Sequence, residues 1–194
     1  NLSSQITLNR VSTKYYKPEN AVERSVLTRF EKVPTDIYES VDEGVAHIAN
    51  EIAGRIQDRQ REGKFFVIGA GTGASLRPLY AELVRKHKDE GLSFRNVVIF
   101  NLYEHYPLAP ESAGSSFAQL KELFVDQIDI DKQNVFTIDG SIPQESVFEY
   151  CRLYEQRLLT FGGMDIVLMG IGREGNIAMN EPGPNLNSPT RLIL

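Results

Sequence analysis

The chain has 194 residues, of which 41% are hydrophobic and 24% are charged, and its net charge is -5. This length and composition suit one soluble α/β domain with a full core. There is no basic stripe, and no apolar run reaches the length of a membrane helix, so we expect neither nucleic acid nor membrane as a partner. The lone Cys151 cannot form an internal disulfide, which favours a reducing compartment, the cytoplasm, and no metal cluster.

The N-terminal region, residues 1–34, is polar and carries a weak helical pattern of apolar residues around residues 21–30. We expect it to be an extension that packs on a domain formed by residues 35–194. Residues 35–40, TDIYES, predict a short strand. Ser40 and Glu43 have the spacing of a capping box, which predicts that a helix begins after Ser40.

Beyond this point apolar strands alternate with amphipathic helices. The strands are expected at residues 65–69, 97–100, 134–139 and 164–170, and the helices at 75–91, 117–124 and 143–163. This order is typical of a doubly wound, mainly parallel sheet with helices on both faces, a Rossmann-like fold of three layers. The β-prone segment at residues 190–194 ends without a turn or cap, so we expect the α/β domain to continue beyond Leu194.

Ligands of parallel sheets bind beyond the carboxyl ends of the strands, which points to the loops after residues 68, 100 and 169. The first, GAGTGAS at residues 69–75, offers backbone amides and a helix N-terminus to an anion. It lacks the lysine of a Walker loop, and no acidic residue ends the next strand, which disfavours triphosphate and dinucleotide binding. A tight strand-to-helix turn is the simpler alternative.

The third loop, GIGREGNIAMNEPG at residues 170–183, also fits the pattern G-x-G-x-x-G. Three prolines follow Gly175 in a stretch without helical period, so no long helix stands behind these glycines. Glu174 and Glu181 lie where ligands of a parallel sheet bind, although a solvated turn would also accommodate them.

In combination, the three loops resemble those of the glucosamine-6-phosphate deaminase family, within the wider group that includes 6-phosphogluconolactonases. The matching motifs are TGAS, FNLYEHYPL and MGIGREGNIAMNEPG, at residues 72–75, 100–108 and 169–183. The resemblance implies isomerisation of an amino-sugar phosphate with release of ammonia, and it requires no cofactor. Members often form oligomers, so a homo-oligomer is one expectation.

The resemblance also implies binding roles. The family's phosphate loop, Thr-Gly-Gly-Thr, is matched by Thr72, Gly73, Ala74 and Ser75. Gly170 and Gly172 open the third motif and are expected beside the bound sugar phosphate. Arg191 stands where members with an allosteric N-acetylglucosamine-6-phosphate site have an arginine, but Ile193 replaces the partner lysine, which makes that control doubtful.

Two catalytic positions differ from the family's pattern. Tyr103 stands where the family has the aspartate that moves the proton of the sugar's second carbon. Asn176 replaces the histidine of the ring-opening relay, whose carboxylates are matched by Glu174 and Glu181. A tyrosine side chain ordinarily titrates near pH 10 and an amide does not titrate, so neither is suited to proton transfer at neutral pH. Each positioned acid or base typically contributes about 10² to 10⁴ in rate, so these changes could remove most activity.

Glu104 and His105 are candidate catalytic replacements, since they follow Tyr103 directly. Glu104 would need a backbone change to reach the vacated position, because successive side chains of an extended segment face opposite ways. A surface histidine is the alternative for His105. The sequence thus predicts a deaminase-type or isomerase-type domain with acid–base groups at Glu104, Glu174 and Glu181. The alternatives are a binding or regulatory module that lost catalysis, beside another domain in a longer polypeptide, and a 6-phosphogluconolactonase-type hydrolase.

Overall fold

A computed structural model describes residues 20–29, 33–183 and 187–193. The chain divides into two compact units, residues 1–44 and 45–194. In the first unit, α1 (Ala21–Thr28) begins at Asn20, whose side chain accepts a hydrogen bond of 2.9 Å from the Glu23 amide. This helix confirms the weak helical pattern. Most of the extension expected at residues 1–34, including Phe30, lies outside the described residues, and its packing on the α/β domain stays a prediction.

Residues 35–40 form no strand, so that prediction was wrong. A strand needs a neighbouring strand for its backbone hydrogen bonds, whereas this segment leads directly into α2 (Val41–Arg61). The Glu43 amide donates to Ser40 Oγ (3.1 Å), and the Glu39 amide donates to the Glu43 carboxylate (3.1 Å). The capping box is therefore confirmed, with the residue before Ser40 making the return bond.

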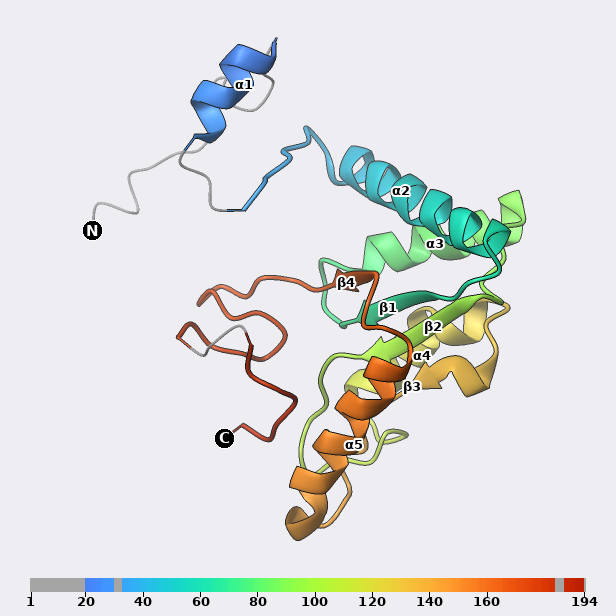
Figure 1. The fold of residues 1–194 in the computed structure, drawn as a ribbon, viewed down its shortest axis with the longest axis vertical. Coiled ribbons are helices and arrows are strands. Elements are labelled where there is room, and N and C mark those ends of the chain that lie inside the picture. Colours follow the sequence, from blue (N-terminus) through green and yellow to red (C-terminus); the bar gives the residue numbers. More distant parts are fainter. Residues whose placement is uncertain (1–19, 30–32, 184–186, 194) are drawn as a thin grey trace. The chain divides into compact units, whose positions relative to one another are not determined.

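A four-stranded parallel sheet forms the centre of the second unit (Figure 1). Its strands, in the spatial order β3-β2-β1-β4, are β1 (Phe66–Ala70), β2 (Val97–Asn101), β3 (Val135–Phe136) and β4 (Ile166–Leu168). The predicted parallel sheet is confirmed, but β3 and β4 are shorter than the strands expected at residues 134–139 and 164–170. After β3 the chain leaves the sheet and bonds to α5 instead, where the Tyr150 hydroxyl accepts from the Asp139 amide (2.8 Å) and donates to the Thr137 carbonyl (3.0 Å).

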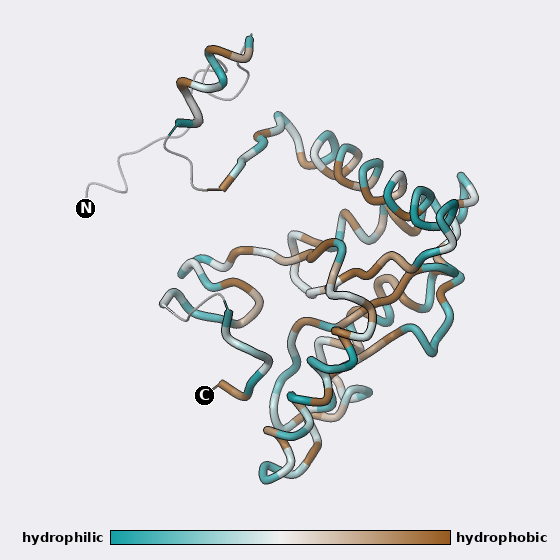
Figure 2. The backbone as a smooth tube through the Cα atoms, in the orientation of Figure 1, coloured by the Kyte–Doolittle hydropathy of each residue, from teal (hydrophilic) through white to brown (hydrophobic). Residues whose placement is uncertain are grey.

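Helices cover both faces of this sheet, as predicted. On one face lie α2, α3 (Arg77–Glu90) and α4 (Ser116–Leu123), where the Tyr80 and Phe124 rings stack with centroids 5.0 Å apart. On the other lies α5 (Val147–Thr160), where the Phe100 ring stacks on that of Phe136 (4.7 Å). Figure 2 shows hydrophobic residues concentrated along β1 and β2. Burial between helices explains why these strands read as continuous apolar runs.

Short 3₁₀ turns connect some of these elements: η4 (Val125–Gln127), η5 (Lys132–Asn134) and η6 (Gln144–Ser146). The predicted end of α3 is confirmed, because Gly91 has a φ of +74° and its amide donates to the Lys86 carbonyl. This left-handed conformation favours glycine at a helix end.

Throughout residues 20–29, 33–183 and 187–193, each helix is too short or too polar to span a bilayer.

The strand order reverses at β1. The chain passes from β1 through α3 to β2 and then β3, and α5 carries it back to β4 on the other side of β1. In open parallel sheets a crevice forms beyond the carboxyl ends of the strands at such a reversal. The loops after β1 and β4 are therefore the natural place for a ligand. We call them the β1 loop (residues 71–76) and the β4 loop (residues 169–183).

Candidate functional site

The β1 loop is fixed to the end of β4. The Gly71 amide donates to the Leu168 carbonyl over 2.9 Å. A Cβ at Gly71 would lie 3.0 Å from that carbonyl oxygen and 3.3 Å from the Tyr103 ring, so a side chain there would press on both. Glycine is needed at this position because two segments of backbone approach each other closely.

Three consecutive amides at the exposed part of the β1 loop are free to bind a ligand. Gly73, Ala74 and Ser75 are exposed, and their amides have no acceptor within the described parts of the chain. The N-cap of α3, Leu76, offers no capping side chain, and the first turn contains no acidic residue. The positive end of the helix dipole is therefore open, which is how backbone anion sites are built. Binding of phosphate here stays a prediction.

Ser75 lies against the β4 loop. A Cβ added at Gly170 would be 2.9 Å from Ser75 Oγ, so this glycine leaves the space that the serine hydroxyl occupies. The structure thus brings together two residues that were both predicted to contact the ligand, from loops far apart in the sequence. The two residues meet beyond the carboxyl ends of β1 and β4, the neighbouring strands where the strand order reverses.

Thr72 turns its polar groups toward the protein. Its amide donates to the Tyr103 hydroxyl (2.8 Å), and that hydroxyl donates to the Thr72 carbonyl. Thr72 Oγ1 lies 2.7 Å from Ser116 Oγ and 3.2 Å from the Tyr103 hydroxyl. The Thr72 hydroxyl, which the resemblance placed on the phosphate, is therefore bonded to α4 and Tyr103, whereas Ser75 is exposed and its hydroxyl lies beside Gly170.

Two tyrosines hold the start of the β1 loop. Tyr103, expected at the position of the catalytic base, is half-buried, and its hydroxyl contacts both backbone groups of Thr72. The buried Tyr80 hydroxyl donates to the Gly71 carbonyl over 2.6 Å. Burial, with a smaller contribution from Tyr103, raises the pKa of Tyr80 well above its ordinary value. The Tyr80 hydroxyl therefore remains a donor at neutral pH.

Glu104 caps the N-terminus of α4. Four donors surround its carboxylate: the Ser115 hydroxyl (2.6 Å) and the amides of His105 (2.8 Å), Ser116 (2.8 Å) and Phe117 (3.0 Å). A carboxylate at a helix N-terminus satisfies amides that have no partner inside the helix, and the helix dipole stabilises its charge. The structure gives Glu104 this structural role, and its predicted catalytic role stays a prediction.

His105 belongs to a segment that contacts the loop after β3. Its side chain is exposed, and a Cβ at Gly140 would overlap the His105 carbonyl. The Leu108 amide donates to the Gly140 carbonyl over 3.1 Å, which fixes the segment further. No described residue bonds to the His105 imidazole, so its predicted role as a catalytic replacement has no structural support and stays untested.

The β4 loop folds back on itself after β4. The Gly172 amide donates to the Asn176 carbonyl, and Ile177 and Asn180 exchange two backbone hydrogen bonds, each over 2.8 Å. Between them Ala178 and Met179 have φ values of +47° and +66°. Non-glycine residues in the left-handed region cost about 1 to 3 kcal/mol each and tend to occur at functional sites. No helix occurs in residues 170–183, as predicted.

The predicted ring-opening residues do not form one hydrogen-bonded group. The Asn176 side chain lies over Gly172, where an added Cβ would overlap it. Glu174 and Glu181 are exposed and have no hydrogen-bond partner among the described residues. Arg191, the predicted allosteric residue, donates to Asn180 Oδ1 over 2.9 Å and so contacts the β4 loop directly.

Sequence reasoning missed the buried polar residues behind the β1 loop. Asn101, Ser115 and Ser116 are all buried, and Asn101 Nδ2 donates to the Tyr103 carbonyl over 3.0 Å. Asn101 Oδ1 has no partner within the part of the chain that the structure describes. Ser115 could have been found, because a serine directly before an apolar helical pattern predicts an N-cap.

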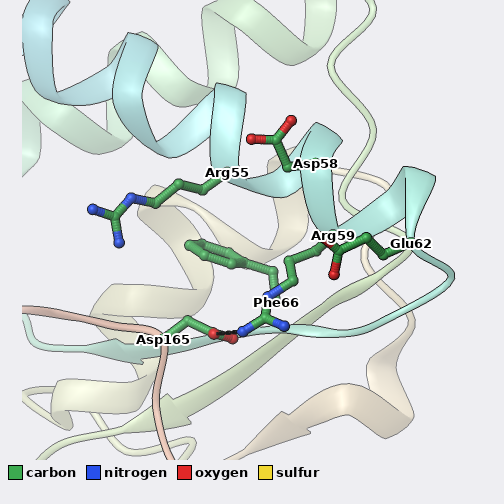
Figure 3. A pocket seen from close by; sticks show the side chains of 6 residues that line it. All are labelled: Arg55, Asp58, Arg59, Glu62, Phe66 and Asp165. Carbon is green, nitrogen blue, oxygen red and sulfur yellow. Dashed lines mark hydrogen bonds and ion pairs between the residues drawn. The ribbon is translucent and has the colours of Figure 1, made fainter.

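An open pocket of about 250 Å³ lies at the amino ends of β1 and β4 (Figure 3). It is lined by Arg55, Asp58, Arg59, Glu62, Phe66 and Asp165. The Arg59 guanidinium pairs with the Asp165 carboxylate, which also accepts from the Val67 amide (2.8 Å). The pocket lies at the start of β1 and β4, whereas ligands of such sheets bind beyond the other ends of the strands. We therefore interpret the contacts of Asp165 with Arg59 and Val67 as structural, since they join β4 and α2 to β1.

The fold is that of a doubly wound α/β domain, with an open helix N-terminus at the reversal of its strand order, where domains of this class bind small molecules. The model of the family "Glucosamine-6-phosphate isomerases/6-phosphogluconolactonase" matches residues 39–181. The chain therefore belongs to this family, as the three motifs predicted.

Individual relatives agree with this assignment. A protein of Bacteroides thetaiotaomicron, named as glucosamine-6-phosphate deaminase-like, is 62% identical over the whole of this chain, which covers 29% of that protein. The glucosamine-6-phosphate deaminase of Dictyostelium discoideum is 36% identical over 151 residues, 75% of this chain and 56% of that protein. The chain thus spans less than two thirds of each of these relatives.

Solved structures show the same fold. A monomeric glucosamine-6-phosphate deaminase superposes with a TM-score of 0.72 at 31% identity, over 78% of this chain and 60% of that one. A 6-phosphogluconolactonase of Thermotoga maritima superposes with a TM-score of 0.56 at 23% identity, over 70% of this chain and 59% of that one. The second likeness concerns the fold alone.

Proposed function

We propose that this domain binds an amino-sugar phosphate, with the phosphate on the amides of Gly73, Ala74 and Ser75, and that its deaminase chemistry is strongly impaired. The observation that carries the proposal is a row of three exposed amides at the uncapped N-terminus of α3, for which the described residues provide no acceptor. Arg77 is the charged residue of that first turn and adds to the positive potential. Together with the Ser75 hydroxyl, these groups match the charge and geometry of a phosphate.

Impairment follows from the groups that surround this site. Deamination requires proton transfers by groups that titrate near neutral pH. The Tyr103 hydroxyl is bonded to Thr72, the Glu104 carboxylate is occupied by four donors, and the side-chain amide of Asn176 does not titrate near neutral pH. Groups that act as a unit lose nearly all of their effect when one is lost, so the remaining rate would be small.

The second candidate function is an active deaminase or isomerase. It is favoured by the two exposed carboxylates of the β4 loop, Glu174 and Glu181, which are free to act on a sugar held nearby. The names of the two relatives, a glucosamine-6-phosphate deaminase-like protein and a glucosamine-6-phosphate deaminase, also favour it. Because the Bacteroides relative is much longer than this chain, either function would be exercised within a longer polypeptide.

Calorimetry on the full-length protein tests the proposal. Glucosamine 6-phosphate, glucosamine and inorganic phosphate are titrated separately, and ammonia and fructose 6-phosphate are followed in the same samples. We expect binding of the sugar phosphate, weaker binding of inorganic phosphate, no binding of glucosamine, and little ammonia. Rapid release of ammonia that falls in Glu174→Gln would establish the second candidate, and the absence of binding by every phosphate would reject both.

A further inference from the structure

The Tyr103 hydroxyl is in an unusual position for a residue that replaces a base. It accepts a hydrogen bond from the Thr72 amide over 2.8 Å and donates its own proton to the Thr72 carbonyl. The ring lies against Gly71, where an added Cβ would be 3.3 Å from Tyr103 Cε1. One side chain therefore satisfies both backbone groups of the second residue of the β1 loop.

The remaining contacts of the β1 loop divide it into a held part and a free part. Gly71 is held by the Tyr80 hydroxyl at 2.6 Å, and Thr72 is held by Tyr103 and by Ser116 Oγ at 2.7 Å. The amides of Gly73, Ala74 and Ser75 have no acceptor in the described residues, and the next amide, that of Leu76, donates to the Gly73 carbonyl over 3.1 Å. Tyr103 acts at the boundary, on the last residue before the three free amides.

We propose that Tyr103 is a positioning residue that fixes Thr72 and thereby aims the amides of Gly73, Ala74 and Ser75 at a phosphate. This inference rests on the proposed phosphate-binding function. A loop whose entry is fixed loses less conformational entropy when it binds a ligand, and the saving appears as affinity. Tyr103 acts through Thr72 and does not itself touch the ligand.

The same geometry argues against proton abstraction by Tyr103. Removing the hydroxyl proton would break the bond to the Thr72 carbonyl and place a negative oxygen beside that carbonyl. It would also place a second negative charge beside the site where the phosphate is expected, which costs affinity through like-charge repulsion. The protonated hydroxyl is the form that holds the loop.

Tyr150 provides a matched control. Its hydroxyl also accepts a hydrogen bond from a backbone amide, that of Asp139 (2.8 Å), and donates one to a backbone carbonyl, that of Thr137 (3.0 Å). Thr137 and Asp139 follow β3, and β2 separates β3 from β1 in the sheet. Removing either hydroxyl therefore takes away the same two kinds of hydrogen bond from a loop, but only Tyr103 is bonded to the β1 loop.

The test compares Tyr103→Phe with Tyr150→Phe in the full-length protein. Hydrogen exchange of the β1-loop amides is measured without ligand, and the affinities for glucosamine 6-phosphate and inorganic phosphate are measured by calorimetry. We expect Tyr103→Phe to speed exchange at Thr72 and to weaken both affinities about threefold to thirtyfold, whereas Tyr150→Phe changes neither. If Tyr103→Phe does not fold, Ser116→Ala removes another anchor of Thr72 and is expected to weaken both affinities in the same direction.

The outcomes separate this inference from the proposed function. Wild-type binding with an unchanged or tighter affinity in Tyr103→Phe overturns the inference and leaves the proposed function standing. Equal weakening by Tyr150→Phe also overturns it, since the effect would then be general loosening of the domain. If the wild type binds neither glucosamine 6-phosphate nor inorganic phosphate, the proposed function is overturned. The positioning role of Tyr103 is then overturned as well, whatever the exchange rates show.

Discussion

The β1 loop and the β4 loop meet at the same edge of the sheet, but they are held in different ways. Side chains of Tyr80, Tyr103 and Ser116 reach the β1 loop from its surroundings. The β4 loop is bonded mainly to its own backbone and to Arg191, and its two glutamates are exposed. A loop tied to buried groups opens rarely, whereas an exposed, self-bonded loop opens at low cost in free energy.

This contrast follows the pattern of substitutions. The β1 loop keeps the small residues and the terminal hydroxyls of the phosphate loop that it resembles, and it is built into the fold. At the positions to which the resemblance assigns acid–base chemistry the chain has Tyr103 and Asn176, and the structure uses these residues to pack and to bond the loops. Under the proposed function, phosphate recognition and proton transfer are therefore separable, and the β1 loop carries groups suited to the first.

The largest effect is expected where the β1 loop touches β4. In Gly71→Val the new side chain would press on the Leu168 carbonyl, whose oxygen lies 3.0 Å from the Cβ position. We expect a loss of about 1 to 3 kcal/mol in the free energy of unfolding, as in other overpacked sites, together with loss of sugar-phosphate binding. Urea unfolding and calorimetry measure the two effects.

Gly54→Val, in α2, is the matched control for this substitution, because, outside the helix's own backbone, no atom of the described residues lies within 4 Å of its Cβ position. Its stability and affinity should stay close to those of the wild type. If Gly71→Val bound sugar phosphate as well as Gly54→Val does, the β1 loop would not depend on its contact with β4.

A negative charge at Ser75 should remove binding while leaving the fold intact. Ser75 is exposed, so Ser75→Glu puts a carboxylate among the free amides without filling buried space. We expect affinity for glucosamine 6-phosphate to fall at least about tenfold, equivalent to about 1.4 kcal/mol. Ser146→Glu, at the exposed start of α5, is the control and should bind normally. Equal affinities of the two variants would place the phosphate elsewhere.

A smaller effect is expected at the cap of α4. Glu104→Gln replaces a charged acceptor of four hydrogen bonds, and we expect it to lower the free energy of unfolding by about 0.5 to 2 kcal/mol, the range for lost helix caps. Glu122→Gln, an exposed change on the same helix, serves as the control. Unchanged stability combined with a loss of ammonia release would instead assign Glu104 to catalysis.

The smallest effects should come from the β4 loop. Glu174→Gln and Glu181→Gln alter exposed side chains without partners among the described residues, so stability should change by less than about 0.5 kcal/mol. Affinity for the sugar phosphate should change less than in Ser75→Glu. A large fall in ammonia release in either variant would show that the β4 loop still performs acid–base chemistry.

The parts of this fold that a local pattern determines could be predicted from the sequence. Apolar runs located β1 and β2, the pair Ser40 and Glu43 located the start of α2, and Gly91 located the end of α3. The strand predicted at residues 35–40 failed because the composition of a short segment cannot show whether a neighbouring strand is present.

The site was predictable only in part, for a related physical reason. Glycines and hydroxyls between a strand and a helix indicated the β1 loop directly. The bond between Tyr103 and Thr72 joins residues 31 positions apart, and the cap formed by Glu104 depends on where α4 begins. Neither contact produces a periodic pattern in the sequence. The family motif therefore assigned Tyr103 and Glu104 to catalysis and gave no sign of their structural contacts.

The most direct test of the central claim is a nuclear magnetic resonance titration of the full-length protein with glucosamine 6-phosphate, following the backbone amides of both loops. We expect the amides of Gly73, Ala74 and Ser75 to shift most, with little ammonia formed during the titration. Shifts confined to the β4 loop around Glu174 and Glu181, with rapid release of ammonia, would contradict it.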